Sequence, residues 1–386
     1  MLRHLAFIPA VFVFAVSCSN EVPSLPTAGV MSDSVGVSVW SVPGDDVPAP
    51  FTLERVGGLA MPDTGWAVWP DGVAVDTEQR TIYVLDESTP RVLVFDLDGG
   101  FLRQVGRKGQ GPGEYDAPTA LQVAPTGELL VMDPGAGFIH RWSPAGEYMD
   151  RDPISVSYWG PGFHAMAAGM VYTTAGGVES GVMREALVSV GVDGVDTLSV
   201  LESAWKPIEM PCGRVPVPEV FSWSAVWGAH SDWVAFMRVP DYEIVLRHAS
   251  EPVAVFRRDV PPREIGPAEA EASVAVGPLE FLVTGCGMTS AGVVREAGFV
   301  PRVSSVIHLA VDPAGRVWAA RGEAPVVESI DIFDLQSGFV GSAATMGVPA
   351  AFVTESRYVA IVDGEWGPVL EFWEVTPATE ETGGEG

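Results

Sequence analysis

Short apolar runs alternate with polar turns along most of this chain, and they recur with a regular period. In residues 72–105, an apolar run and a polar turn are followed by a run rich in β-branched residues at 81–85, and then by apolar runs at 91–95 and 101–105. Short apolar runs bounded by Gly, Pro, Asn and Asp are typical of β-strands. The pattern therefore predicts four short antiparallel strands in one module.

The same module returns along the chain, at residues 120–148, 159–201, 224–257, 307–343 and 350–375. Repeats of about 40 residues with four strands each are typical of the blades of a β-propeller. We therefore expect an all-β protein, a six-bladed β-propeller of four-stranded antiparallel blades that spans residues 51–376. An open β-sandwich array is the alternative, although a sandwich has no reason to repeat its turn spacing so regularly.

The sixth module contains only three strands before the polar, Gly-rich tail at residues 377–386. Its fourth strand is expected from residues 51–56, because TLERVGG at 52–58 resembles FLRQVGR, which contains the fourth strand of the first module. An N-terminal strand in this position closes the ring. Closure removes two strand edges that would otherwise pair with other chains.

Three stretches carry a resemblance to a known family: GQGPGEYDAP at residues 109–118, VAPTGELLVMD at 123–133 and VDPAGRVW at 311–318. Together they resemble NHL-type repeats, and the chain after its first 17 residues is similar to bacterial six-bladed β-propeller lipoproteins. The resemblance is good in the first, second and fifth blades and poor in the third and fourth. Its implication is architectural. Propellers of this group include scaffolds, lyases and lactonases, and the fold does not select among them.

The first residues indicate the compartment. Arg3 and His4 precede a twelve-residue apolar run and then Cys18, so residues 1–17 are expected to be a signal peptide. Ala15-Val16-Ser17-Cys18 resembles a bacterial lipobox, which predicts a lipid on Cys18, and ordinary signal cleavage is the alternative. Residues 18–50 are rich in Ser, Pro, Val and Asp and are expected to form a tether, with a possible extra strand over residues 35–42. We thus expect an exported protein, lipid-anchored in the cell envelope at the outer membrane or facing the periplasm.

The formal net charge of −28 excludes some partners. Nucleic acid and anionic lipid surfaces repel so acidic a body, so the only membrane contact expected is the lipid anchor. With 47% hydrophobic residues, the chain has enough apolar surface for a large core.

Once Cys18 is assigned to lipid, two cysteines remain. Cys212 and Cys286 both lie in stretches that break the blade pattern, and an exported protein meets oxidising conditions. A disulfide between them is therefore expected, with two buried free thiols as the alternative. Cys286 belongs to an insertion between blades four and five, residues 261–302, in which PAEAEASVAVGPLEF favours a short helix that could lie over one mouth of the ring.

The candidate binding site is the face on which the loops between second and third strands lie. The residue that ends the second strand is read as Asp86, Asp133, Ala175, Arg238, Arg321 and Asp363 in blade order. Three aspartates would then stand together opposite two arginines, and such a dipolar mouth could orient a zwitterionic ligand. The alternative is structural, because an Asp there often caps the following loop and Arg321 could pair with Asp363.

A metal or a catalytic group could use the same mouth. Asp86, Asp133 and Asp363 are weak candidates for calcium ligands, since calcium prefers carboxylate oxygens. No cofactor is otherwise implied, and the scattered histidines lack the spacing of a zinc site. We read His164 and His308 as the two histidines on inner strands, from which either could reach the channel, and His308 joins the candidate binding residues.

No catalytic motif is present: Gly-x-Ser-x-Gly is absent, and no motif brings Ser, His and an acid together. We therefore expect a binding module, active as a monomer, that holds a protein, peptide or glycan at the loop-rich face. The alternative is a metal-dependent lactonase- or lyase-like enzyme with its site at the channel mouth.

Overall fold

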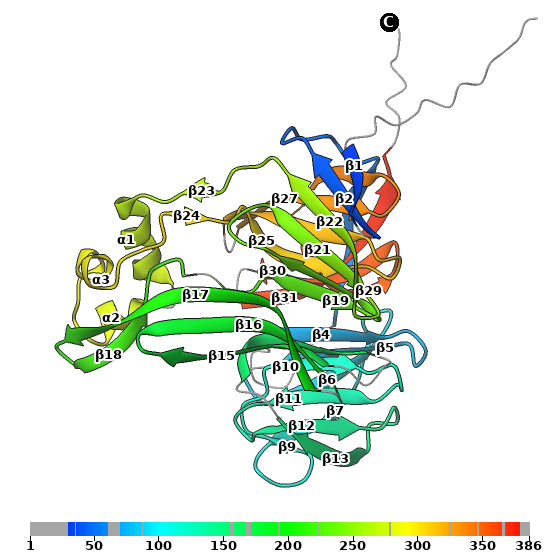
Figure 1. Cartoon of the computed structure of the whole chain (residues 1–386). Helices are drawn as coiled ribbons and strands as arrows, with labels where there is room; N and C mark the ends of the chain where they lie inside the picture. The colour runs from blue at the N-terminus through cyan, green and yellow to red at the C-terminus, as the bar shows by residue number, and fades with distance from the viewer. Residues whose placement is uncertain are drawn as a thin grey trace, which may run out of the picture.

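Six blades, each built on four antiparallel strands, follow one another around the ring, and two of them carry additional strands at an edge (Figure 1). The computed structural model describes residues 30–34, 36–60, 70–86, 88–154, 158–166, 171–191, 194–222, 224–277, 279–323, 326–345, 347–364 and 367–378. The predicted signal peptide, Cys18 and residues 379–386 lie outside this part of the chain. The prediction of a six-bladed β-propeller is confirmed.

Blades one and two are the most regular. Blade one consists of β4 (Pro70–Asp76), β5 (Thr81–Asp86), β6 (Arg91–Asp96) and β7 (Phe101–Val105). Blade two consists of β10 (Ala120–Val123), β11 (Leu129–Asp133), β12 (Phe138–Trp142) and β13 (Tyr148–Pro153). The loop between them contains β8 (Arg107–Lys108) and β9 (Glu114–Tyr115), which pair in parallel. Gly106 in this loop has a φ of +68°, and a Cβ there would lie 2.2 Å from the Tyr115 ring, so only glycine fits.

The remaining blades follow in chain order. Blade three consists of β14 (Tyr158–Ala165), β15 (Val171–Glu179), β16 (Val182–Gly191) and β17 (Gly194–Met210), with β18 (Gly213–Pro218) added at its edge. Blade four consists of β19 (Trp227–His230), β20 (Trp233–Met237), β21 (Glu243–His248) and β22 (Glu251–Arg258). Blade five consists of β25 (Val306–Val311), β26 (Val317–Glu323), β27 (Val326–Asp334) and β28 (Gly338–Ala344). Blade six consists of β29 (Pro349–Thr354), β30 (Arg357–Gly364) and β31 (Gly367–Pro377).

The N-terminal strand β3 (Phe51–Gly58) is the fourth strand of blade six, as predicted. It pairs antiparallel with β31, so that Leu53 lies opposite Val375. The chain therefore closes the ring with a strand from each end. A shared hydrophobic cluster, which includes Phe95 of blade one and Phe372 of blade six, fills the junction.

The segment before β3 also packs on the ring. The strands β1 (Val30–Ser34) and β2 (Val37–Val42) form a hairpin, and β2 pairs in parallel with β22 at the outer edge of blade four. We call residues 37–50 the strap. Trp40 and Val42 of the strap are buried in the cluster between blades four and five. Residues 37–50 were expected to belong to a tether with a possible extra strand over 35–42. They are packed against the propeller, and β2 lies within that range.

A buried ionic network holds the strap in place. Arg258 and Asp331 form an ion pair whose two side chains are fully buried. Asp331 also accepts a hydrogen bond from the Tyr242 hydroxyl at 2.7 Å, and Arg258 donates to Asp46 of the strap at 2.6 Å. Arg321 reaches both Asp46 and Asp331. Buried charges are tolerated only when each finds a partner, and here the partners come from the strap and from both blades.

The insertion and the end of blade three together form a separate unit, which we call the arm (residues 204–222 and 261–304). It contains α1 (Pro267–Val276), α2 (Glu280–Thr284), α3 (Ser290–Ala297) and the short ribbon β23 (Arg263–Glu264) and β24 (Arg302–Val303). Proline stands at the first position of α1, where its missing N–H costs nothing, and the Thr289 hydroxyl caps α3 by accepting from the Gly292 N–H. The helices pack beside the β17–β18 hairpin, away from the blades (Figure 1).

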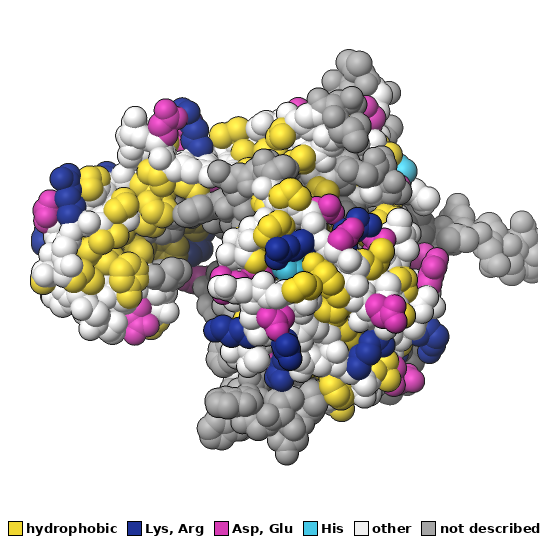
Figure 2. Space-filling view, turned by 90° about the horizontal axis from the view of Figure 1, so that it is seen from below, with side chains coloured by type: hydrophobic (Ala, Val, Ile, Leu, Met, Phe, Trp, Pro, Cys, Tyr) yellow, Lys and Arg dark blue, Asp and Glu magenta, His cyan; other side chains and the backbone are white. Residues whose placement is uncertain are grey.

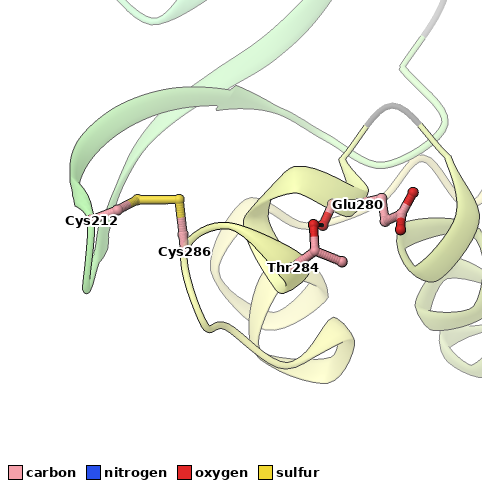
Figure 3. The surroundings of a disulfide bond; sticks show 4 residues. All are labelled: Cys212, Glu280, Thr284 and Cys286. Atoms are coloured by element: carbon pink, nitrogen blue, oxygen red, sulfur yellow. Dashed lines mark hydrogen bonds between the residues drawn. A yellow bond between two sulfur atoms is a disulfide. The ribbon is translucent and has the colours of Figure 1, made fainter.

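The arm is stapled by a disulfide. Cys212, in the turn between β17 and β18, is bonded to Cys286, which follows α2 (Figure 3). The predicted disulfide is therefore present. Apolar side chains gather on the surface of the arm (Figure 2), where Val215, Val276 and Phe281 are exposed. None of the helices in the described residues is both long and apolar enough to cross a membrane.

The central channel as candidate functional site

The six inner strands enclose a cavity with a volume of about 1020 Å³. Its walls come from β4, β10, β14, β19, β25 and β29, which means that every blade contributes. Many of the lining residues are apolar. The side chains of Leu121, Phe163, Leu309 and Val353 are buried in the clusters between blades, whereas those of Val75, Ile307 and Ala351 are partly exposed. A cavity of this size, with both apolar and polar groups in its wall, is large enough to hold a small molecule.

Three histidines from neighbouring blades line the cavity: His164 on β14, His230 on β19 and His308 on β25. His164 and His308 lie on inner strands, as the sequence pattern indicated. The third, His230, was missed because the blade pattern drifts in residues 224–257. His230 could have been assigned to an inner strand from its position at the end of β19, just before the turn that leads into β20.

His164 is the most enclosed of the three. Its Nε2 lies 2.6 Å from the backbone carbonyl of Ser231, so this nitrogen carries the proton and donates across the junction of blades three and four. Burial lowers the pKa of His164 to about 4. The side chain is therefore neutral at neutral pH and serves as a fixed hydrogen-bonding group.

The other two histidines are also held neutral. The His308 side chain is open to the lumen but surrounded by the ring, and this enclosure lowers its pKa, although a hydrogen bond to the Pro349 carbonyl at 3.3 Å acts in the opposite direction. Burial likewise lowers the pKa of His230, with the Asp312 carboxylate opposing the shift. All three histidines can therefore donate or accept hydrogen bonds in the channel without adding positive charge.

Among the lining residues that the structure describes, the acidic ones all stand at the same end of the channel. Asp76, Glu78, Asp232 and Glu355 belong to the cavity wall where inner strands lead into their following turns. No Lys or Arg side chain is found among the lining residues in the described part of the chain. The electrostatic potential at this end is thus set by carboxylates.

The residues that were expected to form a dipolar mouth do not meet around this cavity. Asp86 is fully buried and accepts from the Ser88 hydroxyl at 2.7 Å and from Arg91 at 2.9 Å. Asp133 is fully buried as well, and it accepts from three backbone N–H groups, those of residues 116, 117 and 136. Both aspartates cap loops, which is the structural alternative considered for them.

The three other candidates lie apart. Arg238 is exposed and pairs with Glu243 at 2.7 Å, while Asp363 is exposed near the end of β30. Arg321 pairs with Asp46 and Asp331, and not with Asp363 as the structural alternative had suggested. These residues were compared on the assumption that each one ends the second strand of its blade. The assumption fails where that strand is long, because β15 continues past Ala175 to Glu179 and β26 continues past Arg321 to Glu323.

Of the candidate binding residues, only His308 lines the channel cavity. The geometry does not support a calcium site formed by Asp86, Asp133 and Asp363, because the carboxylate oxygens of Asp86 and Asp133 accept hydrogen bonds from their own loops. Within the residues described, no group of three or more His, Cys, Asp or Glu side chains is arranged to hold a metal ion.

Comparison with known proteins supports the architecture. A model of the six-bladed β-propeller family DUF5128 matches residues 74–143, which cover blade one and most of blade two. The chain is a six-bladed β-propeller. A protein from Bacteroides fragilis that is named as exported has a similar structure, with a TM-score of 0.51 and 14% identity over 88% of this chain and 100% of its own.

Two propeller enzymes are more distant in structure. A gluconolactonase from Xanthomonas campestris aligns with a TM-score of 0.43 and 13% identity, over 86% of this chain and 98% of its own. A streptogramin B lyase aligns with a TM-score of 0.41 and 11% identity, over 84% of this chain and 98% of its own. At such low identity the likeness concerns the fold, and the propeller fold serves many activities.

Proposed function

We propose that this propeller is a binding protein of the cell envelope that takes a small ligand into its central channel. The observation that carries the proposal is the cavity of about 1020 Å³ that all six inner strands line. Ligand sites of drug-sized molecules usually measure about 300–1,000 Å³ and combine apolar walls with a few oriented polar groups. The three neutral histidines supply such groups.

Binding without catalysis is the better-supported function. The enzyme considered from the sequence needs a metal held by Asp86, Asp133 and Asp363, and two of these carboxylates are buried in loop caps. A protein, peptide or glycan at the loop-rich face is the other binding mode, and the experiment below separates it from channel binding.

We further propose that the protein is exported and anchored through Cys18. Support comes from the Cys212–Cys286 disulfide, because such bonds persist in oxidising compartments. Metabolic labelling with a palmitate analogue tests the anchor. The label should be incorporated by the native chain and lost from the Cys18→Ser variant, which should then leave the membrane fraction. Equal labelling of both proteins would contradict the anchor.

Thermal unfolding in a small-molecule panel tests channel binding. A ligand at a hundred times its Kd should add about 2.7 kcal/mol of stability, which raises the melting temperature measurably. The blocked variant Ser224→Trp places an indole at a lining position that is exposed to the cavity, and Ser180→Trp places the same group on the exposed β15–β16 turn.

Channel binding predicts that a compound stabilises the native chain and Ser180→Trp but not Ser224→Trp. Equal stabilisation of all three proteins would place the ligand elsewhere. If no small molecule acts but a protein, peptide or glycan does, the loop-rich face becomes the binding site and the channel proposal is wrong.

A further inference from the structure

The tautomer of His308 is fixed by the neighbouring blade. The side chain is exposed in the channel wall on β25, and its Nε2 lies 3.3 Å from the backbone carbonyl oxygen of Pro349 at the start of β29. A carbonyl oxygen can only accept a hydrogen bond, so Nε2 carries the proton and donates. In a neutral imidazole the second nitrogen is then an acceptor, and Nδ1 of His308 has no donor among the residues that the structure describes. His308 therefore offers a hydrogen-bond acceptor to a molecule in the channel.

His230 has no fixed tautomer. Its partly exposed side chain lines the channel at the end of β19, and neither of its ring nitrogens is hydrogen-bonded to a residue in the described ranges. This ring can therefore donate or accept as its partner requires. His164 differs, because its Nε2 donates to the Ser231 carbonyl and its side chain is only 8% exposed. Of the three histidines, His308 and His230 are thus the more accessible to a ligand.

His308 and His230 stand at different heights in the channel. The strands β19 and β25 are neighbours, and a Cβ on Gly228 would lie 2.3 Å from the backbone oxygen of Leu309, so these two residues are level. His230 is then level with Val311, which is three residues beyond His308. A strand rises about 3.3 Å per residue, which places the two histidines about 10 Å apart along the channel.

Among the residues described, none places a charge inside the channel that would hold an ion. No Lys or Arg side chain belongs to the wall, and burial in the ring lowers the pKa of both histidines, which are therefore neutral at neutral pH. Of the carboxylates at the turns, Asp76 caps its own turn and Asp232 has a partner. Glu78 and Glu355 are exposed to solvent. An ion inside would lose hydration without gaining a partner of opposite charge, so an uncharged molecule is favoured.

We propose that the channel binds uncharged, elongated molecules with hydroxyl or amide groups, and that one such group donates a hydrogen bond to Nδ1 of His308. A second polar group, about 10 Å away, contacts His230, which donates or accepts as the ligand requires. Partly exposed apolar side chains of the wall, such as Val75 and Ala351, contact the body of the molecule. This proposal rests on the proposed function and adds the class of ligand.

The first test determines the tautomer directly. The full chain with Cys18→Ser is prepared with isotope-labelled histidine, and nitrogen chemical shifts in NMR spectra distinguish a protonated from an unprotonated ring nitrogen. At neutral pH, His308 should show a protonated Nε2 and an unprotonated Nδ1, and its signals are identified by their loss in His308→Phe. A protonated Nδ1 would leave no acceptor for the ligand and would overturn the proposal.

Four probes of similar size then test the class of ligand. Benzyl alcohol is uncharged and donates a hydrogen bond, benzyl methyl ether is uncharged and does not donate, benzylamine is a cation, and phenylacetate is an anion. Each is titrated into the labelled protein, and its dissociation constant is read from the shifts of the His230 and His308 signals. Benzyl alcohol should bind about fivefold more tightly than the ether, the factor expected for one hydrogen bond, and more tightly than either ion.

Two variants assign the hydrogen bond to His308. His308→Phe removes the acceptor and keeps an aromatic ring, so it should abolish the difference between the alcohol and the ether, as read from the His230 signals. His248→Phe is the matched control, because it makes the same change at an exposed histidine on β21, and it should leave the difference as it is.

The outcomes distinguish this proposal from the proposed function. If none of the four probes shifts the signals of His230 or His308, the channel is closed to small molecules and the proposed function is wrong. If probes bind but the alcohol has no advantage over the ether, or if an ion binds best, the channel is a ligand site and only the class of ligand is overturned. A difference that survives in His308→Phe would overturn the role of His308. Should that variant fail to fold, the four probes on the unsubstituted channel still decide the class of ligand.

Discussion

The ring and the arm are built on different kinds of hydrophobic core. Clusters in the ring are shared by neighbouring blades, as when Phe95 of blade one packs with Phe372 of blade six. The cluster in the arm, which includes Ile208 and Leu282, contains only residues of the arm. Loss of a ring contact should therefore affect two blades at once, whereas damage to the arm should stay local. We therefore expect the stability of the arm to be largely separate from that of the ring.

The largest effect is expected from the buried ion pair of the ring. Asp331→Ala leaves the guanidinium of Arg258 buried without its main partner and removes the acceptor of the Tyr242 hydroxyl. Removal of one member of a buried ion pair typically costs about 3–5 kcal/mol. Equilibrium denaturation should show a lower free energy of unfolding for the whole ring, because the network joins the strap and two blades.

Asp334→Ala on the same strand is the control. Asp334 accepts from the Ser337 hydroxyl at 2.8 Å and the Gln336 N–H at 2.9 Å in a turn, and such bonds contribute about 1 kcal/mol each. Equal losses in the two variants would show that the buried network adds nothing beyond an ordinary turn contact.

The second prediction concerns the arm alone. Replacing both Cys212 and Cys286 by serine opens a loop of 74 residues, for which the chain-entropy model gives about 4 kcal/mol. Hydrogen exchange should accelerate in α1, α2, α3 and the β17–β18 hairpin, while the amides of blades one and two keep their protection. The idea that the arm is a separate unit fails if exchange in those blades accelerates to the same extent.

The same division explains how much of the fold could be predicted. In blades one and two, short strands end at turn residues, so Asp86 and Asp133 were placed at strand ends correctly. In blade three, β15 runs through Gly176 and Gly177 because its hairpin with β16 extends beyond the blade. The two glycines therefore do not end the strand, and the local sequence pattern does not indicate that the strand continues through them.

The candidate site was harder to predict than the ring. Position at a strand end identified Asp86 and Asp133, but a sequence does not show whether a carboxylate faces a channel or caps its own loop. The carboxylates that do line the cavity, such as Glu78 and Glu355, lie in the turns after inner strands. Those turns were not considered because the opposite face of the ring was expected to bind ligands.

The third prediction uses pH to separate the ring from the arm. Burial lowers the pKa of His164 in the folded state to about 4, from an ordinary value of 6.5. The stability linked to this group is present above pH 6.5 and is lost as the pH falls toward 4, because the unfolded chain takes up the proton first. The loss should not exceed about 3 kcal/mol, from 1.36 kcal/mol for each unit of pKa difference.

The arm contains no histidine, so this loss should appear in the ring. Denaturant unfolding measured between pH 7 and pH 4 should show a smaller decrease for His164→Gln, which retains a hydrogen-bond donor but does not titrate. His248→Gln, in which an exposed histidine on β21 is replaced, serves as the control and should follow the native chain. An unchanged decrease in His164→Gln would show that other groups cause the acid sensitivity.

The smallest effect on stability is expected from an ion pair at the tip of the arm. Like the pair in the ring, it joins an arginine to a carboxylate, but it is exposed to solvent. Arg214 lies 3.3 Å from Glu209, and both side chains are more than half exposed. Exposed pairs contribute about 0.2–1 kcal/mol, because water screens the charges and holding two long side chains costs entropy. Arg214→Ala should thus change thermal unfolding barely, while Arg258→Ala, which empties a buried site among Asp46 and Asp331, should lower stability severalfold more. Similar losses in these two variants would mean that burial does not set the strength of the pair, and the distinction between ring and arm would lose its electrostatic basis.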